Sequence, residues 1–376
     1  MISRGDLYPD EVRTSDLVPA WLTRWRALAL AVGVAGLVVW GLIAGAVVPV
    51  WAIDTGGTQH RDIDLYAEIA SRVASGGSYY QVAIPLQQQW NFPTTPAATV
   101  REPLAAWTIA LLGPSGARIL LLGLLVGAIV TMMIRLERSG TNRFEWYASM
   151  LLLVATASAF VAPGAVYLHE CWAMTFILLS LAARTDRRWW PAVLFALAAV
   201  LFRETAIVYP ATMAVVALVQ RRRSEVIGWV TGGAVWAAFY AWHLGQVAAA
   251  QVPDPHAAPS WVAFGGWPFI VSSVRFGTAL GVGPYWLAAL LVPLALAGWL
   301  FARGPLGLRV GLTAVAFTAT FLVVGRSINL YWGLLYAGAL LPGLAFAPRG
   351  IATTIRALRS SSEGSAMPAE SRTQAP

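Results

Sequence analysis

Long apolar runs alternate with short polar segments along most of this 376-residue chain. Several runs reach about 18 residues, the length that crosses the hydrocarbon of a bilayer as a helix. The runs are continuous rather than alternating, which favours helices over a barrel. The pattern predicts an all-α, polytopic integral membrane protein with about ten transmembrane helices, at Ala27–Trp51, Gly116–Leu136, Trp146–Val161, Cys171–Ala183, Trp189–Phe202, Thr205–Val219, Ile227–Val247, Tyr285–Ala302, Val310–Val324 and Leu330–Phe346.

Two polar stretches, 52–115 and 248–284, are too long to be simple connectors. Within the first, Pro103–Leu112 is apolar, but ten residues extend only about 15 Å as a helix, half the hydrocarbon thickness. We therefore expect an interfacial helix there. Residues 1–346 are predicted to form a single transmembrane domain whose large first loop carries juxtamembrane helices. The Ser-, Ala- and Pro-rich residues 347–376 are predicted to form a disordered cytoplasmic tail.

The charged residues, 12% of the chain, give the predicted spans an orientation. All 26 basic residues are arginine, and they lie in clusters at 135–143, 184–188, 221–223, 303–309 and 349–359. These clusters fall on one side of the membrane if both termini are cytoplasmic, as the positive-inside rule requires. The net charge of +8 therefore reflects orientation and not nucleic-acid binding. The single cysteine, Cys171, excludes an internal disulfide framework.

The remaining ionisable residues gather on the predicted outer side and come from at least five loops or span ends. Charges near lipid are costly unless paired or solvated, so their convergence predicts a functional site. A set of independent interfacial ion pairs is the alternative. The residues are Arg61, Asp62, Asp64, Glu68, Arg72, Arg101, Glu102, Arg118, His169, Glu170, Arg203, Glu204, Arg275 and Arg326.

The segment from His60 to Ala70 holds three carboxylates, and helical spacing separates them. One stripe, with a mainly apolar continuation, contains Asp62, Tyr66, Ile69 and Val73, whereas a fully polar stripe contains Asp64, Glu68 and Arg72. Asp62 on a packed face is a candidate general base. Two alternatives are an N-cap at Asp62 and a metal site formed by His60, Asp62 and Asp64.

Three arginines at predicted outer span ends, Arg118, Arg203 and Arg326, are candidates for holding a phosphate, because the guanidinium fork suits its geometry. Taken singly, each is better explained by snorkelling or by pairing with a neighbouring glutamate, such as Glu204. Together they would make a strongly cationic outer cavity. Glu170, beside His169, is either part of this cavity or half of an interfacial dyad.

Several short motifs occur in a characteristic order. Asp62, Tyr66 and Glu68 are followed by Gly76, Gly77, Tyr79 and Tyr80; then come Arg101 to Leu104, Gly116 to Leu120, Glu170, Leu201 to Thr205 with Pro210, and Gly325 and Arg326 with Tyr331 and Pro342. This order resembles that of the GT-C-fold glycosyltransferases, polytopic enzymes that use polyprenyl-phosphate sugars and include protein mannosyltransferases and the aminoarabinose transferases of lipid A.

The resemblance implies an inverting, hexosyltransferase-type activity on the extracytoplasmic face of a bacterial inner membrane. It implies a polyprenyl-phosphate sugar as donor, a lipid or glycan as acceptor, Asp62 as base, and neither a metal nor another cofactor. The substrate-binding residues that it implies are Tyr66, Arg101, Arg118, Glu170, Arg203, Glu204 and Arg326. The alternatives are a transporter or flippase for a lipid-linked or anionic solute, and a catalytically silent scaffold.

Overall fold

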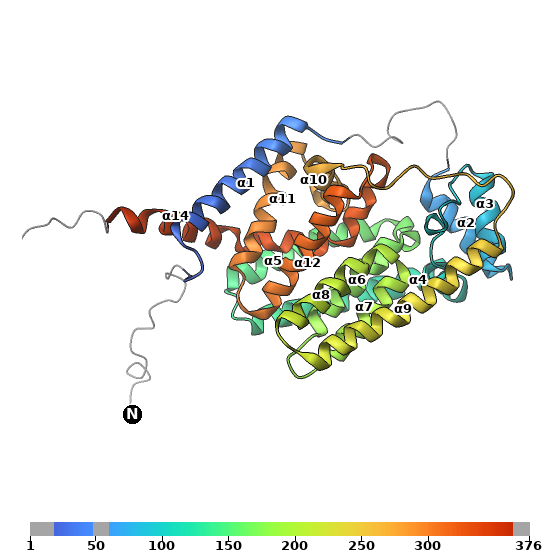
Figure 1. Ribbon diagram of the computed structural model, residues 1–376, viewed down its shortest axis with the longest axis horizontal. Coiled ribbons are helices and arrows are strands. Elements are labelled where there is room, and N and C mark those ends of the chain that lie inside the picture. Colours follow the sequence, from blue (N-terminus) through green and yellow to red (C-terminus); the bar gives the residue numbers. More distant parts are fainter. Residues whose placement is uncertain (1–18, 48–59, 364–376) are drawn as a thin grey trace, which may run out of the picture.

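The computed structural model describes residues 19–47 and 60–363, without the side chains of 360–363, and this part of the chain is all-helical (Figure 1). It contains two isolated β-bridges and no strand. The α-helices are α1 (Arg24–Ala44), α2 (Asp62–Ala74), α3 (Tyr79–Gln89), α4 (Leu104–Arg138), α5 (Arg143–Ala157), α6 (His169–Ala183), α7 (Trp190–Phe202), α8 (Val208–Val219), α9 (Arg223–Ala249), α10 (Gly266–Phe276), α11 (Tyr285–Gly298), α12 (Gly304–Val323), α13 (Ala337–Leu340) and α14 (Ala347–Glu363). The 3₁₀-helices are η3 (Ala97–Thr99), η4 (Ser158–Val161), η5 (Pro163–Tyr167), η6 (Glu204–Ile207), η7 (Ala279–Val282), η8 (Trp299–Phe301), η9 (Ser327–Leu335) and η10 (Leu341–Phe346).

Several of these helices could span a membrane. Within the described residues, four are long and apolar enough, namely Arg24–Ala44, Ala97–Arg138, Arg143–Val161 and Gly304–Val323, and a bent pair from Ser327 onward would make a fifth. Shorter apolar helices lie at His169–Ala183, Trp190–Phe202, Glu204–Val219 and Tyr285–Phe301. The architecture is therefore compatible with a membrane protein, but the structure does not confirm a count of about ten spans.

Helix α6 is the buried centre of the fold. Only Phe176 and Ala183 of its fifteen residues are more than slightly exposed. It packs against α4, α7, α12 and η9. A helix that is apolar on every side is stable only when other elements surround it. Because the polar residues His169 and Glu170 begin this helix, the fold buries both of them.

The last predicted span, Leu330–Phe346, is not a continuous helix. It is divided into η9, α13 and η10, and the bent pair turns by 53° at the break after Leu335. Two glycines in this segment allow close contacts with neighbouring backbone. A Cβ at Gly333 would clash with the Ser273 carbonyl oxygen, and one at Gly343 would clash with the Ala295 carbonyl oxygen. This segment therefore follows close contacts with α10 and α11 rather than its own helical propensity.

Three other segments differ from expectation or refine it. The predicted outer loop 248–284 contains α10, an almost fully buried apolar helix. Residues 347–363, predicted to be disordered, form α14, because Ile351, Ile355 and Leu358 recur at helical spacing; residues 364–376 lie outside the described residues. Helix α4 begins one residue after Pro103 and bends at Gly113 (φ 70°), where we expected the interfacial helix to end.

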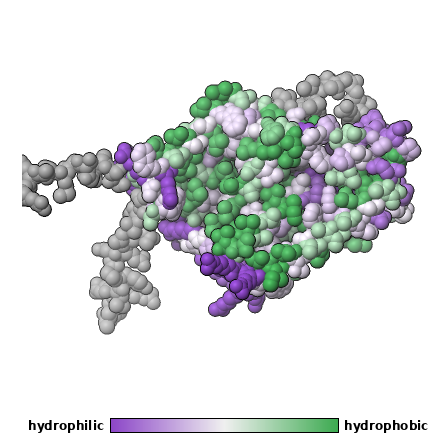
Figure 2. Space-filling model, in the orientation of Figure 1, coloured by the Kyte–Doolittle hydropathy of each residue, from purple (hydrophilic) through white to green (hydrophobic). Residues whose placement is uncertain are grey.

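The arginine clusters meet at one end of the molecule. Contacts between them include Arg135 with the Arg184 carbonyl (3.2 Å), Arg222 with Asp186 (2.7 Å), Arg303 with the Gly140 carbonyl (3.1 Å) and Arg349 with Glu145. We call this the arginine-rich end. Figure 2 shows hydrophobic surface lying between a hydrophilic patch near the turn from α8 to α9 and the hydrophilic surface of α2 and α3. The second region, the α2 end, has its own small core that includes Leu65, Ile69, Tyr80, Ile84 and Val247.

Candidate functional site

A buried ion network joins four elements at the α2 end. Arg203 follows the last residue of α7, where the backbone becomes extended, and its side chain is fully buried. Its Nε donates to Glu170 at the start of α6 (2.6 Å), and its Nη1 donates to Glu204 in η6. Two carboxylates thus neutralise the guanidinium, as burial of a charge requires. We call this set, with Arg101, Tyr66 and Tyr331, the Arg203 network.

Arg101 links the network to α2 and η9. Its Nε donates to the Tyr66 hydroxyl oxygen (3.1 Å), its Nη1 to Glu204 (3.4 Å) and its Nη2 to the Tyr331 hydroxyl oxygen (3.3 Å). The Tyr79 hydroxyl donates to the Arg101 carbonyl (2.7 Å) and fixes the backbone there. Burial raises the pKa of Tyr66 to about 12, so its hydroxyl keeps its proton at neutral pH. The structure thus brings together five of the predicted substrate-binding residues: Tyr66, Arg101, Glu170, Arg203 and Glu204.

The three carboxylates of α2 are all partly buried and differ in their partners. Asp64 accepts from Arg61 (2.9 Å) and Glu68 accepts from Arg72 (2.8 Å) on the polar stripe. Hydrogen bonding by Arg61 lowers the pKa of Asp64. Asp62 is half-buried and has no hydrogen-bond or ion-pair partner among the described residues. Its charge acts on the nearby hydroxyls of Tyr66 and Tyr331.

The alternative that made Asp62 an N-cap is wrong. Arg61 occupies the N-cap position, and its backbone N–H donates to the Asp64 carboxylate (3.2 Å). The alternative metal set of His60, Asp62 and Asp64 does not assemble either. The His60 ring stacks on Trp90 with centroids 3.7 Å apart, Asp64 is paired with Arg61, and residues 60–363 hold no group of three metal-ligating side chains.

The other two predicted arginines lie outside the ion pairs of the network. Arg326 precedes η9 and is half-buried beside Tyr331. In the described structure it has no carboxylate partner, and its buried Nε has no hydrogen-bond partner. Arg118 donates from Nη2 to the Val161 carbonyl (2.7 Å), which ties α4 to the end of η4. No contact in the described part of the chain joins Arg118 to Asp62 or Arg203, so its predicted place in the same cavity is not supported.

Several buried polar atoms around the Arg203 network lack a partner, as do others elsewhere in the described structure, among them Arg135 Nε and Ser149 Oγ. Within the described residues, the buried atoms without a partner include His169 Nδ1, Arg203 Nη2, Thr205 Oγ1, Asn329 Oδ1 and Trp332 Nε1. They come from the start of α6, the α7–η6 turn and η9. Buried polar groups are normally hydrogen-bonded, so these atoms leave free hydrogen-bonding capacity beside the Arg203 network.

Glu102 is a residue that the sequence analysis listed without giving it a role. It is 1% exposed, its Oε1 accepts from Trp236 Nε1 (3.0 Å), and its Oε2 has no described partner. The sequence feature that could have pointed to Glu102 is its position directly after Arg101. The two side chains face different neighbours, because Arg101 contacts α2 and η9 whereas Glu102 contacts α9.

The cavity at this site is small. It lies between α2, α4 and the start of α6, is lined by Tyr66, Ile69, Tyr79, Tyr167 and His169 among others, and has a volume of about 10 Å³. That volume holds about one water molecule.

In comparisons with known proteins, no family model matches the chain, and neither a curated protein nor a solved structure is significantly similar to it.

Proposed function

We propose that this protein is a membrane glycosyltransferase of the GT-C type, which moves a sugar from a polyprenyl-phosphate donor to an acceptor hydroxyl on the extracytoplasmic face of a bacterial inner membrane. The observation that carries the proposal is the state of Asp62. It is the one carboxylate of α2 without an arginine partner in the described structure, and it lies beside Tyr66 and Tyr331 next to the buried Arg203 network.

The proposed reaction follows from these groups. Asp62 accepts the proton of the acceptor hydroxyl while the oxygen attacks the anomeric carbon of the donor sugar. The bond from that carbon to the phosphate oxygen breaks, and the polyprenyl phosphate leaves with the electron pair. Attack from the face opposite the leaving group inverts the anomeric configuration. Arginines close to the phosphate stabilise the developing negative charge.

The ion pairs support an order among the arginines for this proposed role. Arg203 and Arg101 already face Glu170 and Glu204, whereas Arg326 has no carboxylate partner in the described structure. Arg326 is therefore proposed as the first contact of the donor phosphate, with Arg101 second. A sugar does not fit a cavity of about 10 Å³, so donor binding in this proposal opens the space between α2 and η9.

The test is transfer from a radiolabelled polyprenyl-phosphate sugar to lipid or glycan acceptors by the purified protein in detergent. Asp62→Asn is expected to lose about 10² to 10⁴ in rate, which is the usual contribution of a general base. Asp64→Asn is the matched control, because Asp64 lies two residues away on the polar stripe and should leave transfer unchanged. Full transfer by Asp62→Asn would refute the proposed base.

A second candidate function is a transporter or flippase for a lipid-linked or anionic solute. The observation in its favour is the division of the last apolar segment into η9, α13 and η10, because discontinuous helices are typical of transporter binding sites. Reconstituted vesicles distinguish the two. A flippase moves the intact polyprenyl-phosphate sugar between leaflets, whereas the proposed transferase releases polyprenyl phosphate only when acceptor is present.

A further inference from the structure

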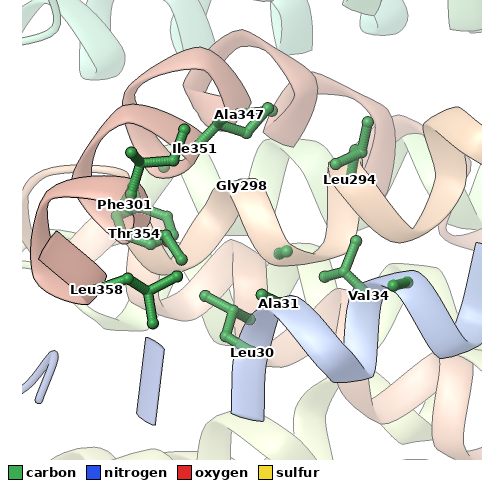
Figure 3. A pocket seen from close by; sticks show the side chains of 14 residues that line it. Leu30, Ala31, Val34, Leu294, Gly298, Phe301, Ala347, Ile351, Thr354 and Leu358 are labelled. Carbon is green, nitrogen blue, oxygen red and sulfur yellow. The ribbon is translucent and has the colours of Figure 1, made fainter. Parts of the chain in front are cut away.

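An apolar groove lies far from the Arg203 network and is enclosed by α1, α11 and α14 (Figure 3). Its volume is about 280 Å³. Leu30, Ala31 and Val34 of α1 form one wall, Ile351 and Leu358 of α14 form another, and Leu294 of α11 lies at the base. Thr354 is the only lining residue with a polar side chain. The groove therefore suits a hydrocarbon and offers almost nothing to a polar ligand.

The way in which α1 packs creates this groove. Near its start, Ala27 is buried in a small cluster with Phe301 and Ala357. Near its end, a Cβ on Gly41 would lie 3.2 Å from that of Ala289, so α1 and α11 touch closely there. Between these two contacts, Leu30, Ala31, Val34 and Ala35 of α1 line the groove, and the space beside them is unfilled. A gap lined by apolar groups loses its packing contacts unless a guest fills it.

One end of the groove is basic. Helix α1 begins with Arg24 and Arg26 and contains no acidic residue, and Ala27 packs on Ala357, which lies between Arg356 and Arg359 of α14. Helix α14 is amphipathic, with Ile351, Ile355 and Leu358 lining the groove. A helix with one apolar face and a basic polar face is typical of binding at an anionic lipid surface.

Two tryptophans indicate the depth at which this basic end would lie in a membrane. Trp21 is 40% exposed and Trp25 is 75% exposed, and both flank the start of α1. Exposed tryptophans at a helix end are typical of the boundary between headgroups and acyl chains. At that level, the arginines of α1 and α14 lie where a lipid phosphate lies, and the groove runs from there toward the level of the acyl chains.

We propose that this groove binds one acyl chain of an anionic glycerophospholipid, whose phosphate contacts the arginines at the start of α1 and in the second half of α14. The lipid fills the gap under α1 and holds α1 and α14 together. This site is separate from the proposed transfer chemistry and does not depend on it.

Native mass spectrometry of the full chain, released from nanodiscs with equal amounts of palmitoyl-oleoyl phosphatidylglycerol and phosphatidylcholine, tests the proposal. The wild type is expected to retain one phosphatidylglycerol in preference to phosphatidylcholine by about tenfold, because each basic residue near a membrane surface contributes about 1 kcal/mol toward anionic lipid. The double variant Arg24→Gln/Arg26→Gln should lose most of this preference. Arg187→Gln/Arg188→Gln, in the exposed α6–α7 loop, is the matched control and should keep it.

The groove itself is tested by filling it. Ala31→Phe should lower retention of phosphatidylglycerol by about tenfold, since the ring occupies the space of several methylene groups. Val32→Phe is the control, because Val32 is 63% exposed and does not line the groove. Leu358→Phe fills the opposite wall and replaces Ala31→Phe if that variant does not fold. Equal retention of both lipids by the wild type, or unchanged retention by the filled variants, refutes the proposal. So does a dimer that Ala31→Phe converts to a monomer, because the groove would then be a contact between copies.

Discussion

Two buried arginine clusters, one at each end of the molecule, are built from the same residue types but are completed differently. At the arginine-rich end, Arg184 donates from Nε and Nη2 to the two carboxylate oxygens of Glu225 (3.0 and 2.6 Å) and from Nη1 to Asp186 (2.8 Å). Every nitrogen of its guanidinium is satisfied. At the α2 end, Arg203 also pairs with two carboxylates, but its Nη2 has no described hydrogen-bond partner.

The difference separates a structural role from a functional one. Arg184 and Glu225 form a pair that joins the end of α6 to α9. The Arg184 guanidinium leaves no nitrogen free to bind a ligand. The Arg203 network is surrounded by unsatisfied atoms and lies beside the unpaired Asp62 and Arg326. Unsatisfied buried groups cost stability, so a site that keeps them is expected to use them. The following variants test this comparison.

The largest effect is expected at Asp62. Asp62→Asn should lower transfer by about 10² to 10⁴ while the melting temperature stays close to that of the wild type, because the carboxylate has no described partner to lose. Rate and thermal unfolding of the same preparation measure both quantities. A large drop in melting temperature would show that Asp62 has a structural role.

The Arg184–Glu225 pair should show the opposite pattern, with a loss of stability and no loss of transfer. Glu225→Gln leaves the buried Arg184 without its bidentate carboxylate, and breaking a buried pair costs about 3–5 kcal/mol of unfolding free energy. Chemical or thermal unfolding in detergent measures the loss. Transfer per folded molecule should be unchanged. A selective loss of transfer in a stable Glu225→Gln protein would contradict the division between the two ends.

Arg326→Gln tests the proposed phosphate contact. We expect a loss of about 10- to 100-fold in kcat/KM, since a charge-assisted hydrogen bond contributes about 1.5–3 kcal/mol. Stability should be unaffected, because the described structure gives Arg326 no ion pair to break. Arg118→Gln is the comparison, and it should leave kcat/KM close to the wild-type value. Equal losses in both variants would show that the two arginines share one role.

Asp186 gives the smallest effect, and the size of this effect depends on pH. Its hydrogen bond from Arg184 lowers the pKa of Asp186, so the folded state holds this carboxylate ionised below its ordinary pKa of about 3.9. The stability that the pair contributes is therefore present above that pKa and is lost as the pH falls through the lowered value. The difference in melting temperature between the wild type and Asp186→Asn should shrink in this acidic range. A constant difference would contradict the coupling.

The sequence predicted the parts of the site that depend on local periodicity. Helical spacing separated Asp62 from the paired Asp64 and Glu68, and the arginine clusters do gather at one end. The sequence did not predict which arginines are neutralised. That depends on Glu170 and Glu204 meeting Arg203 across α6 and η6, which is a tertiary contact.

The fold was predicted less well wherever packing overrides local preference. Gly333 and Gly343 do not interrupt the hydropathy pattern of the apolar run. In the structure Gly333 lies against the backbone of α10 and Gly343 against that of α11, and the predicted span is broken between them. Helix α10 lies within 248–284, which the hydropathy pattern predicted as an outer loop. Neither its burial nor the glycine contacts can be derived from hydropathy.

The shortness of α7 has a consequence for a surrounding bilayer. Its thirteen residues extend about 20 Å, some 10 Å less than a typical hydrocarbon layer. A bilayer around such a helix would have to thin locally, or Arg203 at its end would lie below the headgroups. Thinning would lower the barrier that a polar group faces on its way to the Arg203 network. A short helix could thus act on the lipid itself and bring the headgroup of a membrane-bound molecule to the level of a buried guanidinium.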